Sequence, residues 1–535
     1  MCNAGLRMRR RLSPLTWLAC FSVLASAAAY GCSSTNDAAQ DGGSDGPGPG
    51  GQDGAPDLDG STAGDSASHD GDAGSFADAA DDDGATRADA DAAPSGPLSD
   101  SYVDFDINHV LSTGQSNSVA NGGGAPSLTQ TQPYTNLMFD TGVMPMKGCD
   151  GNGCTQYDTP AAFAPLVETD KFFNYVVETA SNGIADEISN LALQKYMFGT
   201  KAGYPTKHDV LVSLHGRSGN TYWCLRKNGC NYKPGYLKPF SQGLMEVASA
   251  KALAMAAGKS YIVRAVTTIH GESDHYSYTA GTQEFPLPGT DGVPGAIADY
   301  ADGLIEWQRD YETDVKAITG QTQGIPLLVS QVSGWTDATI SKVAQMELDA
   351  HIRAPGKVVL VTPAYPLDVR NDCLHFSATG ERRLGEYFAK AYAKIIFGGG
   401  TWEPVRPKTV SRAGNVITVQ YFVPKPPLVF DTTRVTNPGN YGFTFLDGSG
   451  APPTITNVAL TAADTIQITL SGTPTGPTPR LRYAQNQPAP GTACIGPGTT
   501  YSGGARGNVR DSDDTPSQYG YDLFNWGVMF DVAAP

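Results

Sequence analysis

Ser116 stands in the segment Thr113-Gly114-Gln115-Ser116-Asn117, directly after an apolar run. A serine on a tight turn at the end of a strand is held for attack, and its own N–H can point at a developing oxyanion. Far along the chain, Asp372 and His375 lie three residues apart. In a turn, this spacing lets a carboxylate orient an imidazole whose other nitrogen faces a hydroxyl, as a serine nucleophile requires. These residues predict acyl-transfer chemistry.

Two further polar segments follow expected strands. They are Gly216-Arg217-Ser218-Gly219-Asn220 and His270-Gly271-Glu272-Ser273-Asp274. Each can place a backbone N–H or a side-chain donor beside the serine, where a developing negative charge needs it.

The elements that must position these segments alternate between strands and helices. Strands are expected at 103–113, 209–214, 261–269, 326–332 and 358–362, and helices at 242–257, 297–318, 340–352 and 378–397. Strands separated by helices of this length predict a parallel sheet in a three-layer α/β/α, flavodoxin-like domain over residues 101–400. In such sheets ligands bind at the carboxyl ends of the strands, where the polar segments fall.

Beyond Trp402 the helical pattern ends. Short alternating segments such as 416–422 and 465–470, among Pro and Gly turns, predict a small C-terminal β-sandwich within residues 401–535. The stretch from about residue 480 is rich in loops, and we expect it to pack back on the first domain.

The first 32 residues have the pattern of an export signal. Basic Arg7 and Arg9–Arg11 precede an apolar stretch from about 15 to 29, which is short for a membrane-spanning helix. Gly31-Cys32 then resembles a lipobox, which predicts a lipid on Cys32. An ordinary cleaved signal is the alternative. We expect an exported protein, either a lipoprotein of the outer membrane or cell surface, held to the membrane by this anchor alone, or a secreted one.

Residues 33–100 contain sixteen Asp, one Arg and no Glu or Lys, set among Gly, Ala, Ser and Pro. Such a segment buries too little apolar surface to offset the entropy of ordering it, so a disordered, extended tether is predicted. It carries −15 of the net charge of −17, and the first 32 residues carry +4, which leaves about −6 for residues 101–535. Nothing there indicates nucleic-acid binding, which needs a basic surface.

Six of the nine cysteines lie beyond the expected signal and lipid site: Cys149, Cys154, Cys224, Cys230, Cys373 and Cys494. An even number in an exported chain favours disulfides. Local pairs Cys149–Cys154 and Cys224–Cys230 are favoured, leaving Cys373–Cys494, although six cysteines allow fifteen connectivities. A zinc site is the alternative, but no pair has the spacing of a structural zinc knuckle. We expect no metal and no cofactor.

Taken together, these motifs resemble the SGNH hydrolases, and more narrowly the sialate O-acetylesterase and carbohydrate esterase family six branch. Gly-Gln-Ser-Asn at 114–117, Gly-Glu-Ser-Asp at 271–274 and Asp-x-x-His at 372–375 stand in that branch's order, over about residues 105–397. The tail resembles the same enzymes at Arg482-Tyr483-Ala484, Gly507-Asn508-Val509-Arg510, Trp526 and Phe530.

The resemblance implies a role for each residue. Ser116 is the expected nucleophile, His375 the base and then the acid, and Asp372 the carboxylate that orients His375. Backbone N–H groups of Ser116 and Gly219 form the expected oxyanion hole. Glu272 is a rival or partner to Asp372, because in some relatives this Glu supports the histidine.

His270 departs from the family, which usually has Gln before Gly-Glu-Ser-Asp as a side chain of the oxyanion hole. A neutral imidazole can still donate one hydrogen bond, and activity would then depend on pH near a pKa of roughly 6.5.

For the substrate, we expect acetylated carbohydrate, either acetylxylan or O-acetylated sialic acid. The expected substrate contacts are Gln115, Asn117, Tyr222, Trp223, Tyr276 and Trp335, with Tyr278 as a further aromatic candidate. Two alternatives stay open. One is a non-catalytic, glycan-binding surface lipoprotein with a decayed esterase domain, and the other is a different SGNH acyl hydrolase.

Overall fold

The computed structural model describes residues 98–120, 128–129, 131–150, 153–168, 177–230, 235–335, 340–370, 372, 374–485 and 505–535. The expected signal, Cys32, all but the last residues of the expected linker, Cys373 and Cys494 lie outside these residues. The predictions made for them therefore stay predictions.

A seven-stranded sheet forms the centre of the α/β part. In spatial order its strands are β5 (Phe163–Pro165), β2 (Leu137–Phe139), β6 (Val210–Leu214), β1 (Ile107–Gly114), β7 (Tyr261–Ile269), β8 (Leu327–Gln331) and β9 (Val358–Pro363). All neighbours pair in parallel except β5, which is antiparallel to β2. Strands β1, β6, β8 and β9 are buried along their whole length, as parallel strands covered on both faces are.

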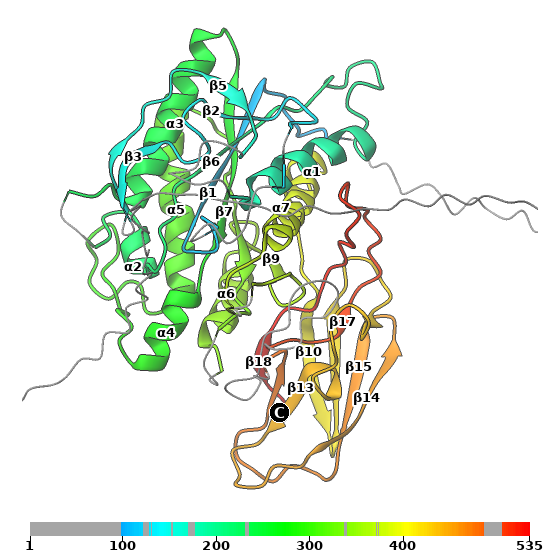
Figure 1. The fold of residues 1–535 in the computed structure, drawn as a ribbon. Helices are drawn as coiled ribbons and strands as arrows, with labels where there is room; N and C mark the ends of the chain where they lie inside the picture. Colours follow the sequence, from blue (N-terminus) through cyan, green and yellow to red (C-terminus); the bar gives the residue numbers. More distant parts are fainter. Residues whose placement is uncertain are drawn as a thin grey trace, which may run out of the picture. The chain divides into compact units, whose positions relative to one another are not determined.

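Helices cover both faces of this sheet. Figure 1 shows α3 (Pro239–Ala256), α5 (Tyr300–Thr319) and α6 (Lys342–Arg353) on one face, and α1 (Ala180–Gln194) and α7 (Ala378–Tyr392) on the other. A π-helical turn, Ala393–Phe397, continues α7. The short helices α2 (Tyr222–Leu225) and α4 (Glu272–Ala280) follow β6 and β7. The predicted mixed α/β architecture with a parallel sheet is thereby confirmed.

Local chemistry fixes where these helices begin and end. Asp299 caps α5 by accepting a hydrogen bond from the Asp302 N–H at 3.0 Å, and Gly320 ends that helix in the left-handed conformation. Ser377 caps α7 through the Gly380 N–H at 3.2 Å. Ser377 follows His375 closely, so this cap fixes the point where the loop after β9 becomes helix.

The strand order brings the ends of β1 and β7 together. After β1 the chain forms β2, β5 and β6 on one side of β1 and then crosses to β7 on the other side, so the order reverses at β1. A crevice at such a reversal, beyond the carboxyl ends of the strands, is where ligands bind in open α/β sheets. The pairing Gly114↔Ile269 places the residues after both strands at this point.

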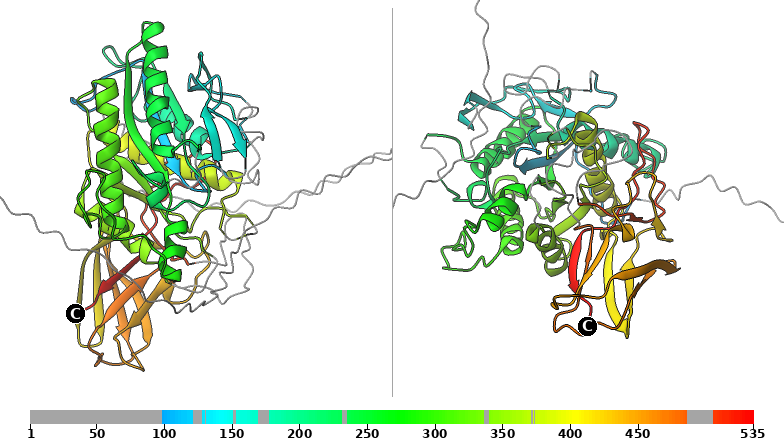
Figure 2. Two further views of the ribbon diagram at one scale, coloured as in Figure 1. Left: turned by 90° about the vertical axis from the view of Figure 1, so that its left-hand side faces the viewer. Right: turned by 60° about the horizontal axis from the view of Figure 1, so that its bottom comes forward.

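The remaining strands belong to smaller antiparallel sheets. They are β10 (Arg406–Ala413), β11 (Val416–Phe422), β15 (Thr465–Leu470) and β14 (Ile455–Ala462) in one sheet, β13 (Phe443–Leu446), β16 (Arg480–Tyr483) and β18 (Phe530–Ala533) in a second, the pair β12 (Val429–Phe430) and β17 (Val509–Arg510), and the hairpin β3 (Met146–Asp150) and β4 (Gly153–Tyr157). Figure 2 shows the orange and red C-terminal strands gathered together with no long helix among them.

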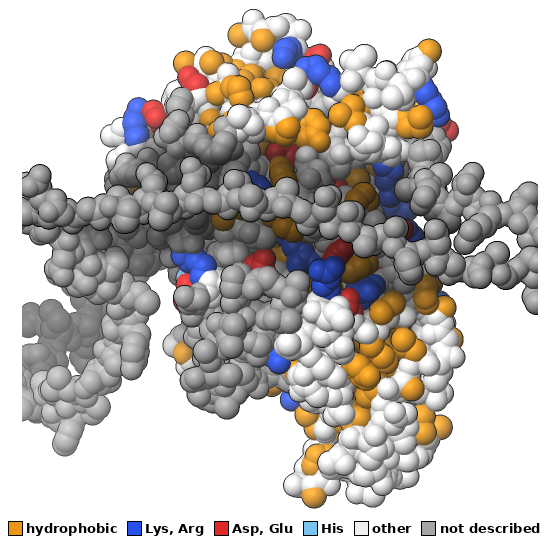
Figure 3. Space-filling view, turned by 45° about the vertical axis from the view of Figure 1, so that its right-hand side comes forward, with side chains coloured by type: hydrophobic (Ala, Val, Ile, Leu, Met, Phe, Trp, Pro, Cys, Tyr) orange, Lys and Arg blue, Asp and Glu red, His pale blue; other side chains and the backbone are white. Residues whose placement is uncertain are grey.

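The last residues return to the α/β part, as expected. Gln331, at the end of β8, donates to the Met529 carbonyl at 3.0 Å and accepts from the Met529 N–H at 2.7 Å. Tyr365 donates to the Gly527 carbonyl at 2.7 Å, and the Lys390 ammonium donates to the Asn525 amide oxygen at 2.9 Å. Basic and acidic side chains lie beside one another on the face in Figure 3. Beneath the surface, Lys390 also pairs with Asp513 at 3.0 Å.

Candidate active site

The turn that carries Ser116 begins at a glycine that no other residue can replace without movement. Gly114 has φ +136°, and a Cβ there would lie 2.1 Å from the Ile269 carbonyl oxygen. Glycine therefore lets β1 and β7 end side by side. Ser118 Oγ donates to the Gln115 carbonyl at 2.7 Å and closes the turn around Ser116.

His375 is held by Asp372. Its Nδ1 lies 2.9 Å from Asp372 Oδ2, while Asp372 Oδ1 accepts hydrogen bonds from the N–H groups of His375 at 2.9 Å and Leu374 at 3.0 Å. Partial burial alone would raise the pKa of Asp372, but these hydrogen bonds lower it well below its usual value. Asp372 is therefore ionised at neutral pH, which keeps the proton on Nδ1 and leaves Nε2 to act as a base.

Asn117 joins the Ser116 turn to the His375 loop. Its Nδ2 donates to the Leu374 carbonyl at 3.1 Å, and its Oδ1 accepts from the Phe376 N–H at 3.1 Å. Ser116 and His375 are the sequence neighbours of these bonded residues. The structure thus brings the predicted nucleophile and the predicted base to one edge of the sheet.

Glu272 takes a different place from Asp372. Its Oε1 accepts a hydrogen bond from Asn117 Nδ2 at 2.8 Å, and its Oε2 has no partner within the described part of the chain. Burial raises the pKa of Glu272, against the hydrogen bonds it accepts and the nearby His375. The two acids that the sequence left open are thereby separated, because Asp372 bonds the His375 ring and Glu272 bonds Asn117.

The predicted oxyanion role of His270 is wrong in this structure, because both ring nitrogens have other partners. Nε2 lies 3.0 Å from the Asn220 carbonyl oxygen, which can only accept, so Nε2 carries the proton and Nδ1 accepts from the Tyr300 hydroxyl at 2.7 Å. Burial lowers the pKa of His270 to about 4. The ring is therefore neutral well below pH 6.5, and the expected pH dependence does not follow from it.

The loop after β6 lies against the nucleophile turn. The Arg217 N–H donates to the Gly114 carbonyl at 2.9 Å, and Gly219 adopts the left-handed conformation with φ +69°. Asn220 Nδ2 donates to the Ser218 carbonyl at 2.8 Å. Asn220 and Tyr300, which fix this loop through His270, were missed from the sequence. Asn220 had a signal, since it ends the Gly-Arg-Ser-Gly-Asn segment.

Two of the four predicted aromatic contacts are buried and cannot present a ring face to a substrate. Tyr222 is 0% exposed and donates its hydroxyl to Glu306 at 2.7 Å, and Trp335 is 4% exposed and packs on the His275 ring at 4.9 Å between ring centroids. Trp223 and Tyr276 remain partly exposed, as does Tyr278. The Arg226 guanidinium lies 5.0 Å from the Trp223 ring centroid and supports that ring from one side.

Gln115 and Asn117 are also positioned for a structural task and not for substrate contact. Both are almost fully buried, and Gln115 Oε1 accepts from the Ser273 N–H at 3.0 Å. Both N–H groups and the oxygen of the Asn117 amide form hydrogen bonds within the protein. The prediction that these two side chains bind substrate is therefore corrected: they tie the turn after β1 to the loops after β7 and β9.

No family model matches this chain, and no curated protein matches it. Several solved structures are similar to it. A carbohydrate acetylesterase from Xanthomonas citri has a TM-score of 0.48 and 11% sequence identity, over 79% of this chain and 80% of that one. A carbohydrate acetylesterase from Sinorhizobium meliloti has a TM-score of 0.27 and 13% identity, over 54% and 99%. An aryl esterase of M. smegmatis has a TM-score of 0.27 and 12% identity, over 53% and 97%.

Esterases are thus among the structural neighbours of this chain.

Two disulfides form at the local pairs favoured from the sequence, Cys149–Cys154 and Cys224–Cys230. The second closes the loop that begins at Trp223, and the Cys230 N–H donates to the Trp223 carbonyl at 3.1 Å. Within the described residues, no group of three or more His, Cys, Asp or Glu side chains could hold a metal ion. Among the same residues, none of the helices is long and apolar enough to cross a membrane.

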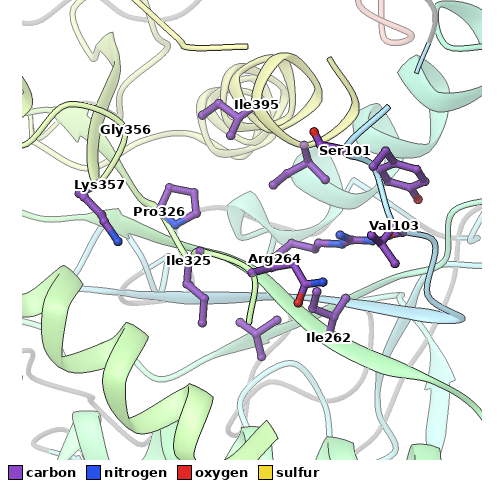
Figure 4. Close-up of a pocket in the computed structure, with 14 residues that line it drawn as sticks. Ser101, Val103, Ile262, Arg264, Ile325, Pro326, Gly356, Lys357 and Ile395 are labelled. Carbon is purple, nitrogen blue, oxygen red and sulfur yellow. The ribbon is translucent and has the colours of Figure 1, made fainter. Parts of the chain in front are cut away.

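A separate cavity of about 350 Å³ lies at the opposite edge of the sheet, where β7, β8 and β9 begin (Figure 4). Its lining includes Arg264, Lys357 and Ile395. The Arg264 guanidinium donates to Asn108 Oδ1 and to the Val103 carbonyl, both at 2.7 Å. Lys357 pairs with Glu312 at 2.6 Å. The cavity contains none of the predicted catalytic residues.

Proposed function

We propose that this chain is a serine esterase that removes acetyl groups from carbohydrate, with Ser116 as nucleophile, His375 as base and Asp372 as the carboxylate that orients it. One observation carries the proposal: Asn117, next to Ser116, bonds the backbone on both sides of His375, whose Nδ1 is already held by Asp372. A hydroxyl beside an oriented imidazole is the arrangement that activates serine.

The reaction proceeds in two acyl transfers. Ser116 Oγ forms a bond to the acetyl carbonyl carbon while His375 Nε2 takes the hydroxyl proton. The tetrahedral intermediate collapses, and the sugar oxygen leaves with that proton from His375. Water then attacks the acetyl-Ser116 ester in the same way and releases acetate. Asp372 remains ionised throughout and stabilises the imidazolium that forms in each step.

The oxyanion is proposed to bind the N–H groups of Ser116 and Gly219. His270 supports this hole indirectly, because its Nε2 holds the Asn220 carbonyl next to Gly219. Losing one such donor typically costs about 10²- to 10³-fold in rate.

Carbohydrate is proposed as the alcohol part of the ester because partly exposed aromatic rings follow two of the strands that end at the site. Trp223 follows β6, and Tyr276 lies on α4 after β7. Sugar rings pack their apolar faces on such side chains. Acetylxylan and O-acetylated sialic acid are the two candidate glycans, as in the sialate O-acetylesterase and carbohydrate esterase family six branch.

Export with a lipid at Cys32, a tether over residues 33–100, and a β-sandwich packing of the two larger C-terminal sheets belong to the same proposal. Rings from both sheets approach each other, since Tyr421 of β11 and Phe530 of β18 have centroids 6.5 Å apart. Metabolic labelling with a fatty acid tests the anchor: label is expected on the wild type and absent from Cys32→Ser.

Hydrolysis of p-nitrophenyl acetate, followed by acetate release from a panel of acetylated glycans, tests the proposed function. We expect Ser116→Ala and His375→Ala to reduce kcat by at least about 10⁴-fold. Ser189→Ala is the matched control, because Ser189 is a buried serine on α1 that bonds Asn136. Equal rates in wild type and Ser116→Ala would reject the esterase. A preference for long-chain esters would indicate another acyl hydrolase, and glycan binding without hydrolysis a non-catalytic protein.

A further inference from the structure

We propose that Asn117 is a positioning residue that sets the distance between Ser116 and His375, and that Glu272 fixes the orientation of the Asn117 amide. This inference rests on the proposed function and adds two residues to its machinery. Neither is assigned a chemical step, since both act through the residues they hold.

The strand order creates the need for such a residue. The nucleophile turn follows β1 and the His375 loop follows β9, and β7 and β8 lie between these two strands. Neighbouring strands are about 4.8 Å apart, so the ends of β1 and β9 are separated by roughly 14 Å. The loop after β9 must therefore return across two strands before its imidazole can reach the serine.

Asn117 supplies the contacts that hold the returned loop. One amide N–H donates to the Leu374 carbonyl, and the amide oxygen accepts from the Phe376 N–H, each at 3.1 Å. His375 lies between these two residues, so its backbone is held on both sides. Asn117 itself follows Ser116 in the sequence. A single amide group therefore links the turn that carries Ser116 to the loop that carries His375.

Glu272 holds that amide in the orientation that both backbone bonds require. An asparagine amide can turn by 180° and exchange its oxygen and nitrogen, which would reverse both bonds to the His375 loop. The second N–H of Asn117 donates to Glu272 Oε1 at 2.8 Å, and this acceptor permits only one of the two orientations. Asn117 is 1% exposed and Glu272 5%, so water offers neither group a ready replacement.

The expected consequence of losing Asn117 is a slower chemical step with little change in substrate binding. An error of about 1 Å in the placement of a catalytic group can cost about 100-fold in rate. Because no Asn117 atom is left free for substrate, KM is expected to stay within about threefold of the wild type while kcat falls by about 100-fold.

The test compares Asn117→Ala and Asn117→Asp with Asn508→Ala. Asn508 is the matched control, because it is a fully buried asparagine whose Nδ2 donates two hydrogen bonds, as that of Asn117 does. Its acceptors are the backbone carbonyls of Asp431 and Val435, and it precedes β17 in the C-terminal part of the chain. Each kcat for p-nitrophenyl acetate is measured well below the melting temperature of that variant and is divided by the folded fraction from near-ultraviolet circular dichroism. Asn117→Ala is expected to lose kcat, and Asn508→Ala only stability.

A second pair, Glu272→Ala and Glu272→Gln, keeps the test decisive if the Asn117 variants do not fold. Glutamine retains an acceptor oxygen at the same reach, so we expect it to restore most of the kcat that alanine loses, to within about tenfold of wild type. A purely structural effect would change melting temperature without this pattern in kcat.

Three results would overturn the inference. They are a kcat for Asn117→Ala within threefold of wild type, an equal loss of kcat in Asn508→Ala, or a loss in Glu272→Gln as large as in Glu272→Ala. In each case the wild type would still hydrolyse the ester and Ser116→Ala would not, so the proposed function would stand. A wild type without esterase activity would instead remove the proposed function and this inference with it.

Discussion

Asp372 and Glu272 are two carboxyl groups near one histidine, and their surroundings give them opposite properties. Asp372 is half-exposed and accepts three hydrogen bonds, two from backbone N–H groups, which outweigh its partial burial and lower its pKa. Glu272 is buried with one oxygen unpartnered within the described residues, and burial raises its pKa. Two neighbouring carboxyl groups whose pKa values are shifted in opposite directions usually have different roles. Here one carries the charge that supports His375, and the other serves as a hydrogen-bond acceptor.

Replacing Asp372 by Asn is therefore expected to reduce kcat by about 10⁴-fold with the fold intact, because the neutral amide favours the wrong tautomer of His375. The measurement is kcat for p-nitrophenyl acetate together with a thermal melt. If Glu272→Gln cost more activity than Asp372→Asn, the assignment of the acid would be reversed.

Residue types and order alone predicted the two local disulfides. They also singled out Ser116, His375 and Asp372, whose segments are held together through Asn117. They did not predict which polar and aromatic side chains would be buried and hydrogen-bonded within the protein. Tyr222 was expected to contact a sugar, but its buried hydroxyl donates a hydrogen bond to Glu306, 84 residues away. His270 is not an oxyanion donor for the same reason, since its two ring nitrogens are hydrogen-bonded to Tyr300 and Asn220. Such partners come from distant elements, so a local motif does not contain them.

At the scale of elements, strands with clear boundaries were predicted closely. The strand at 261–269 is β7 with the same ends, whereas α1 was missed altogether. In α1, polar and small residues such as Ser181, Asn182 and Gly183 are buried, so the apolar periodicity that marks a helix is weak. Close packing on α7 accounts for the glycine, because a Cβ at Gly183 would lie 2.0 Å from the Arg382 carbonyl oxygen of α7.

Gly385→Ala tests that packing, because helix propensity and close packing predict opposite changes in the free energy of unfolding. A Cβ at Gly385, on α7, would lie 2.3 Å from the Ala180 carbonyl oxygen and 2.6 Å from the Ile184 nitrogen of α1. Intrinsic helix propensity alone would make alanine stabilising by about 1 kcal/mol. The clash with backbone atoms instead predicts a loss of at least about 2 kcal/mol in the free energy of unfolding, measured with urea. A stabilised variant would show that the helices are not so close.

Across the whole molecule, buried ionisable groups tie stability to pH. Burial raises the pKa of Glu187 and of Asp274 to about 8, and that of Glu386 to about 7, with like charges nearby adding to the shift. Burial lowers the pKa of His109 to about 3, and that of His270 to about 4. Raised acids bind more protons in the folded chain than in the unfolded one, and lowered histidines bind fewer.

The two sets oppose each other below pH 6.5, but between pH 6.5 and 8 the acids outweigh the histidines, because an unfolded histidine is at most half protonated there. There the folded protein holds protons that the unfolded chain has released, so the free energy of unfolding is expected to fall as pH rises. The fall should be about 1–2 kcal/mol for each acid with a pKa near 8. Urea denaturation at a series of pH values measures it. Glu187→Gln should make the slope shallower, and a stability that rises over this window would contradict the account.

The most direct test of the catalytic centre is covalent labelling with a p-nitrophenyl alkylphosphonate, which transfers its phosphonyl group to an activated serine and releases p-nitrophenol. Mass spectrometry of the digested protein is expected to find one phosphonyl group, on Ser116, with none at that site in Ser116→Ala and much slower labelling in His375→Ala. If the label were attached to another residue at the same rate in wild type and Ser116→Ala, the site would lie elsewhere. A wild type that hydrolyses p-nitrophenyl acetate while Ser116 stays unlabelled would contradict the account equally.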